Sequence, residues 1–135
     1  MFLGQYDLNF SGKNRLVLPK KFRENLGAVK ELVLTRGLDG CIWGFPKLEW
    51  EKQAEEQTKQ PLTEKESRDL RRYLFSAAEA VDLDDQSRFI IPGVLINYAR
   101  IKTGATLIGA GEYFEIWDKG KWKRKLKEIL ESREE

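Results

Sequence analysis

The sequence contains no histidine and a single cysteine among its 135 residues. Without histidine, Ser-His and Cys-His catalytic triads and histidine-ligated metal sites are excluded. Cys41 alone excludes an intrachain disulfide and a multi-cysteine zinc site, as is usual for a protein of a reducing cytosol. No apolar run approaches the roughly 20 residues of a membrane-spanning helix, and the N-terminus lacks the pattern of an export signal. We therefore expect a soluble cytoplasmic protein with no membrane partner.

What the sequence does contain is enough apolar material for a core, and a repeat. Hydrophobic residues make up 41% and charged residues 34%, which suits one compact domain or two small halves that share a core. The segment KNRLVLP at 13–19 recurs 73 positions later as QSRFIIP at 86–92. Two further matches, LVL at 32–34 with TLI at 106–108 and GCIW at 40–43 with FEIW at 114–117, are spaced by 74. Three matches in the same order predict two tandem units with one inserted residue.

Each unit has the pattern of short strands with one short helix. The predicted strands are 15–18, 31–35 and 41–45 in the first unit and 88–91, 105–108 and 113–117 in the second. Pro19 and Pro92 end a strand and begin the predicted helices 19–26 and 92–98, because proline suits the first turn of a helix. Neither unit can bury both faces alone, so we expect the two to pair in one shared sheet or barrel.

Helices are predicted between and after the repeats. One begins at Pro46 and ends near residue 60, and a second has a capping box with Thr63 as N-cap and Glu66 reaching back. A last helix, about 121–132, has Trp122 on its apolar face. The predicted organisation is a first repeat at 1–46, a helical hairpin at 47–76, a second repeat at 77–118 and a C-terminal helix at 119–135.

The net charge of +2 is unevenly distributed. Residues 1–36 carry +4, residues 76–118 carry −4, and residues 119–135 carry +3. Clustered cations are the electrostatic signature of phosphate binding. The first cluster comprises Lys13, Arg15, Lys20, Lys21 and Arg23.

Three simpler interpretations of these cations remain open. Lys20, Lys21 and Arg23 could belong to a solvated helix face. Arg15 could be buried against a carboxylate from the other repeat. The basic run 119–125 is expected to be a solvated helix surface that Trp122 anchors inward.

Residues 4–27 and 81–92 together resemble the two copies of one bacterial family. The first contains GQY and GKNRLVLPKKFRENLG, and the second is VDLDDQSRFIIP. This pattern is similar to the MraZ family of transcriptional regulators, over nearly the whole chain. The resemblance implies an α+β fold of two tandem swapped-hairpin (SpoVT-AbrB) β units that form a pseudo-twofold barrel flanked by helices. It also implies a ring-shaped homo-oligomer that binds double-stranded DNA at direct repeats upstream of the division and cell-wall gene cluster, in the cytoplasm and nucleoid.

The family's Asp-x-x-x-Arg signature is present in only one copy. The second copy keeps it as Asp84 and Arg88, whereas Ser11 replaces the aspartate that would precede Arg15. Asn14 and Ser87 stand where the family usually has glycine, and asparagine tolerates a left-handed turn better than most residues. Because acidic residues surround Arg88, we expect it to be a structural or subunit-contact residue, or a secondary DNA contact.

The predicted DNA-binding residues therefore come from the first copy: Lys13, Asn14, Arg15, Lys20 and Lys21. The ammonium group of lysine pairs with a phosphate, whereas arginine can donate two hydrogen bonds to the edge of guanine and asparagine can form two hydrogen bonds with the edge of adenine. We expect Lys20 and Lys21 to hold phosphates and Arg15 with Asn14 to contact base edges.

Two other classes of function are alternatives to a regulator. An enzyme would need Asp82, Asp84 and Asp85 to hold Mg²⁺, but no phosphate-binding glycine loop accompanies them. We expect no enzyme activity, no cofactor and no small-molecule substrate. The second class is a ring-forming structural or protein-interaction module, or an antitoxin-like regulator of the same superfamily. Salt-dependent binding to DNA would separate a regulator from a scaffold.

Overall fold

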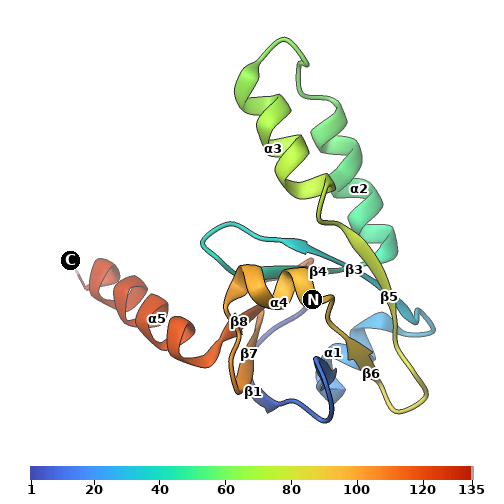
Figure 1. Cartoon of the computed structure of the whole chain (residues 1–135), viewed down its shortest axis with the longest axis vertical. Helices are drawn as coiled ribbons and strands as arrows, with labels where there is room; N and C mark the ends of the chain where they lie inside the picture. Colours follow the sequence, from blue (N-terminus) through green and yellow to red (C-terminus); the bar gives the residue numbers. More distant parts are fainter. Residues whose placement is uncertain (135) are drawn as a thin grey trace.

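The computed structural model describes residues 1–134 of the chain, and Figure 1 shows how its helices and strands are arranged. In chain order the first repeat contributes β1 (Gln5–Asn9), β2 (Arg15–Val17), α1 (Lys20–Leu26), β3 (Glu31–Arg36) and β4 (Ile42–Pro46). Two helices follow, α2 (Lys47–Thr58) and α3 (Lys65–Phe75). The second repeat contributes β5 (Glu79–Asp82), β6 (Arg88–Ile90), α4 (Gly93–Ala99), β7 (Gly104–Gly109) and β8 (Phe114–Asp118), and α5 (Lys119–Arg133) ends the chain.

The two repeats exchange strands. The main sheet has six strands in the order β1-β7-β8-β4-β3-β5, with antiparallel neighbours. The first strand of each repeat thus pairs with the third strand of the other, β1 with β7 and β5 with β3. The order is symmetric about the β8–β4 pair, as expected of two swapped copies. The second strands, β2 and β6, pair with each other in a separate two-stranded ribbon.

The predicted closed barrel is not found in residues 1–134. The six-stranded sheet is open, with β1 and β5 as its edge strands. Each edge strand leads through a loop into the β2–β6 ribbon instead of pairing with the other edge. Leu16 of β2 and Phe89 of β6 are 0% and 1% exposed and belong to the same core cluster as the sheet residues. The ribbon therefore covers one face of the sheet, and this packing completes the core without closure.

The spacing of 74 expected for the later repeat matches is wrong. Leu32 and Leu34 of β3 lie in the main core, and the corresponding core residues of β7 are Ala105 and Leu107, at a spacing of 73. A spacing of 74 would match Leu34 with Ile108, which packs in a separate cluster.

Strands β4 and β8 correspond at a spacing of 72, since both show the same order of buried and partly exposed residues. The turn before β4 spans residues 37–41 and the turn before β8 spans 110–113, so the second copy lacks one residue there.

The helices confirm most expectations, with one correction. Helix α2 begins after Pro46, as predicted. The predicted capping box is wrong, because α3 has Glu64 as its N-cap and no side-chain capping hydrogen bond. Helices α2 and α3 form a hairpin that extends away from the sheet, and α5 extends in another direction (Figure 1).

Helices α2 and α5 are equivalent in how they join the sheet. Trp50 of α2 packs on Phe45 of β4, and Trp122 of α5 packs on Trp117 of β8, with a centroid separation of 5.5 Å in both pairs. The spacing of 72 between Trp50 and Trp122 matches that of the preceding strands.

The division of the chain into a first repeat at 1–46, a helical hairpin at 47–76, a second repeat at 77–118 and a C-terminal helix at 119–135 remains a prediction.

Candidate nucleic-acid interface

The β2–β6 ribbon presents two arginines on its outer face. Its register pairs Leu16 with Phe89, and both side chains point into the core. Because successive side chains alternate between faces, the flanking residues of both strands point outward. Arg15 lies opposite Ile90 and Arg88 lies opposite Val17. The two guanidinium groups are therefore diagonal neighbours on one exposed face.

Two matching loops hold the ribbon in place. The backbone N–H of Ile91 donates to the carbonyl of Asn14, and that of Leu18 donates to the carbonyl of Ser87, each at 2.8 Å. Asn14 and Ser87 occupy the same place in the two copies and have φ angles of 58° and 60°. This left-handed conformation explains why glycine suits the position and why asparagine is tolerated there.

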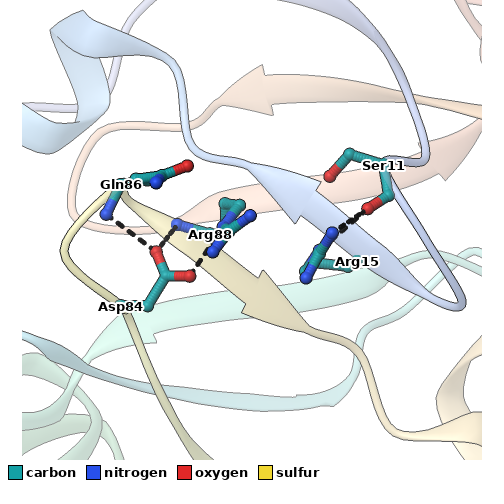
Figure 2. Close-up of polar contacts among 5 residues, drawn as sticks. All are labelled: Ser11, Arg15, Asp84, Gln86 and Arg88. Carbon is teal, nitrogen blue, oxygen red and sulfur yellow. Dashed lines mark hydrogen bonds and ion pairs between the residues drawn. The ribbon is translucent and has the colours of Figure 1, made fainter.

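In the second copy, the arginine is neutralised by its own loop. Figure 2 shows Arg88 Nε donating to Asp84 Oδ2 at 2.6 Å, while Asp84 Oδ1 accepts the backbone N–H groups of Gln86 and Arg88 at 2.9 Å each. These hydrogen bonds favour the charged carboxylate, so the pKa of Asp84 is lowered from its ordinary value. The Asp-Arg signature of this copy is thus an ion pair within one loop.

In the first copy, the arginine contacts a neutral group. Arg15 Nε donates to the backbone carbonyl of Ser11 at 2.8 Å, and Nη2 contacts the same oxygen (Figure 2). Within residues 1–134, no carboxylate lies within 4.0 Å of the Arg15 guanidinium. The interpretation of Arg15 as a buried ion-pair partner of the other repeat is therefore wrong. The same fold holds one neutralised arginine and one free cation side by side.

The other predicted residues lie close to Arg15 along the chain but on two elements. Lys13 is exposed and Asn14 half-buried in the loop before β2, and Lys20 with Lys21 is exposed in the first turn of α1. None of these three lysines forms an ion pair in the described part of the chain. The structure thus leaves all three ammonium groups available to a ligand.

One more basic residue of the cluster has a structural role. Arg23 of α1 donates from Nε to Ser87 Oγ at 2.9 Å and from Nη1 to the carbonyl of Gly27 at 3.2 Å. It therefore links the first repeat's helix to the second repeat's loop. The sequence placed Arg23 among the cations, but nothing in it indicates which of them faces the partner repeat.

A shallow hollow beside the two arginines has mixed charge. Arg15 and Arg88 line it together with Glu79, Asp82 and Asp84. All three carboxylates come from the second repeat, so the ribbon is basic on the side of the first copy and acidic on the other. This agrees with the uneven charge of the sequence.

Comparison with known proteins places the chain in a family. A family model described as "MraZ protein, putative antitoxin-like" matches twice, over residues 1–73 and 74–135. The chain belongs to the MraZ family. A protein of Clostridium acetobutylicum named "Transcriptional regulator MraZ" is 43% identical over 122 residues, and a protein of Clostridium tetani with the same name is 41% identical over 122 residues. Each match covers 90% of this chain and 84% of the relative. The resemblance stated from the sequence is confirmed.

MraZ membership also confirms the expectation that the chain is not an enzyme, since its relatives bear the name of a regulator. Two of the three aspartates of the Mg²⁺ alternative lie beside cations. Asp84 pairs with Arg88, and Asp85 lies 3.6 Å from Lys30. Among residues 1–134 no group of three potential metal-ligating side chains is found.

The lone thiol is free and buried. Cys41 is fully buried, and burial together with the nearby charge of Glu115 raises the pKa of its thiol. In the described part of the chain, no helix is both long and apolar enough to cross a membrane.

Proposed function

We propose that this chain is a transcriptional regulator that binds double-stranded DNA sequence-specifically through its first repeat. The observation that carries the proposal is the difference between the two copies. Within residues 1–134, the Arg15 guanidinium hydrogen-bonds to the neutral Ser11 carbonyl and to no carboxylate, whereas Arg88 forms an ion pair with Asp84. A cation without a carboxylate partner on an exposed face is what a phosphate or a base edge requires.

The proposed contacts divide between phosphates and bases. Lys13, Lys20 and Lys21 are exposed and would neutralise phosphates, which sets affinity and register. Arg15 retains guanidinium donors beyond those that hold Ser11, and Asn14 lies next to it in the turn. These two side chains would contact base edges. Arg15 would donate two hydrogen bonds to a guanine, and the amide of Asn14 would donate and accept hydrogen bonds with an adenine. Arg88 serves structure first and would be at most a secondary contact.

The proposed target is a set of direct repeats upstream of the division and cell-wall gene cluster, bound by a ring of identical subunits. The resemblance to the MraZ family supports this part. One subunit offers a modest basic surface, so binding several spaced boxes at once would raise the affinity through effective concentration. The protein would then act in the cytoplasm, on DNA of the nucleoid.

Binding of the chain to DNA from upstream of its own gene tests the proposal. Fluorescence anisotropy of labelled duplex should show tight, salt-dependent binding that Arg15→Ala weakens by at least ~10-fold, the value of one good base contact. Lys65→Ala, which removes an exposed cation from the helical hairpin, is the matched control and should bind like the parent protein. Light scattering must show the same assembly for both variants.

Two results would contradict the proposal. Unchanged binding by the Arg15→Ala variant would remove Arg15 from the interface. Absence of salt-dependent binding by the parent protein would favour a structural or protein-interaction module.

A further inference from the structure

A second basic site lies at the corner where α4 ends and α5 begins. Arg100 is the C-cap of α4, Lys102 follows it, and Lys121 and Arg124 lie on the first two turns of α5. These four side chains, with Asp118, line a hollow of about 270 Å³. We call this the α4–α5 basic corner. It belongs to the second repeat, which is otherwise the acidic one.

The equivalent place in the first repeat has no such charge. The strand and helix spacings of 73 and 72 relate the four cations to Gly27, Val29, Glu49 and Lys52. The first repeat therefore has one negative and one positive charge at these four positions, whereas the second repeat has four positive charges. Since the repeats share a fold, the fold itself does not require these cations.

Arg100 adopts a backbone conformation that favours glycine. Its φ is 55°, and the equivalent C-cap in the first repeat is Gly27 with φ 57°. A long L-side chain is uncommon in this left-handed region, and such strain is retained chiefly where the side chain has a role. The chain thus carries an arginine where glycine would fit the backbone better.

The charges of the corner are not compensated within the molecule. Both carboxylate oxygens of Asp118 accept backbone hydrogen bonds. Oδ1 accepts from the N–H of Lys102 at 3.3 Å, and Oδ2 accepts from the N–H of Lys121 at 3.2 Å. Lys121 Nζ donates to the neutral carbonyls of Gly40 and Ala99, at 2.8 and 3.3 Å. Over residues 1–134, none of the corner's four cations has a carboxylate within 4.0 Å.

The cationic surface continues beyond the corner along α5. Residues 119–127 include six basic residues and no acidic one. Figure 1 shows this helix extending away from the sheet. Lys125 pairs with Asp39 and Glu128, and Lys127 pairs with Glu131. Within residues 1–134, Lys119 and Lys123 have no carboxylate partner and add to the charge of the corner. Several such cations suit a polyanion with regularly spaced phosphates better than a single small anion. Duplex DNA is such a polyanion.

We propose that the α4–α5 basic corner binds the phosphate backbone of duplex DNA, as a second contact separate from the Arg15 face. This inference rests on the proposed DNA-binding function. The corner would act without regard to base sequence, because its donors are charges that match phosphates. The second repeat thereby contributes to affinity while the first repeat supplies specificity.

The test is the salt dependence of binding to a duplex that lacks the direct repeats. In the variant Arg100→Gly/Arg124→Ala, glycine can adopt the left-handed conformation of Arg100 without strain, so the backbone is expected to be preserved. If both side chains contact phosphates, the slope of log K against the logarithm of the salt concentration becomes less negative by about 1.8 per bound subunit, and affinity at 0.1 M salt falls about 60-fold. The variant Lys52→Ala/Lys65→Ala removes two exposed cations from the helical hairpin and should keep the parent slope.

Equal slopes for the two double variants would overturn the inference while leaving the proposed function intact. An altered subunit assembly of Arg100→Gly/Arg124→Ala in light scattering, with an unchanged slope, would also overturn it, in favour of an acidic surface of another copy. If the parent protein shows no salt-dependent binding to any duplex, the proposed function and this inference fail together.

Discussion

Replacing Leu16 with alanine should unfold the protein far more readily than replacing its neighbour Val17. Leu16 is 0% exposed and Val17 is 43% exposed, although they are adjacent in a three-residue strand. Leu16→Ala removes three buried carbons, worth about 2.4 kcal/mol at roughly 0.8 kcal/mol each. The cavity that remains raises the expected loss to about 3 kcal/mol. Val17→Ala should cost less than about 1 kcal/mol, as a half-exposed substitution.

Thermal unfolding followed by circular dichroism measures this difference. For a chain of this length a loss of about 3 kcal/mol lowers Tm by roughly 10 °C. The Leu16→Ala variant should also bind DNA less tightly at temperatures where it is still folded, because Leu16 anchors the strand that holds Arg15. Equal Tm values for the two variants would refute the argument that the β2–β6 ribbon is part of the single core.

Three further predictions concern single residues. Cys41, buried and with a raised thiol pKa, should resist a thiol reagent at about pH 8 in the folded protein and react fully in denaturant. The pKa of Asp84 is lowered, so its contribution to the free energy of unfolding should be complete above the ordinary carboxyl pKa of about 4 and be lost as the pH falls through the lowered value. Urea titrations at several pH values should therefore show a smaller loss of stability in acid for Asp84→Asn than for the parent protein. Gly44→Ala should lower Tm markedly, because an added Cβ would lie 2.4 Å from Phe114 Cζ; an unchanged Tm would contradict the packing.

The two copies show how one motif can serve two purposes. Both loops place an arginine at the same position of a paired strand and close with the same backbone hydrogen bonds. Among the differences between the loops, the one that decides the partner of the arginine is Ser11, which stands where the second copy has Asp84. Without that carboxylate, the charge of Arg15 is not compensated by an ion pair, and the side chain stays available to a ligand. Local electrostatics therefore separates two sites that the backbone makes equivalent.

Several elements could be predicted from the sequence because their signals are local. The strands before Pro19 and Pro92, the helices after them and the repeat itself depend on short runs of residues. Strand β1 was not predicted, since Gln5, Asp7 and Asn9 are exposed polar residues on a sheet edge. The spacing of the later matches was wrong by one or two residues, because apolar strands look alike until the core assigns their faces. The capping box was wrong because a turn closed by the hydrogen bond from Glu64 N to the Pro61 carbonyl leaves Glu64, not Thr63, at the N-cap of α3.

The sequence by itself determined that two copies of a β-rich unit exist, that their charges differ, and that Arg15 belongs to the basic copy. These properties follow from residue type and order alone. Only the tertiary structure decided that the copies exchange strands in an open sheet, that Arg15 is free while Arg88 is paired, and that cations from α4 and α5 gather at one corner. Those outcomes depend on distances between residues far apart in the chain, and such distances arise only when the two repeats bury one shared core.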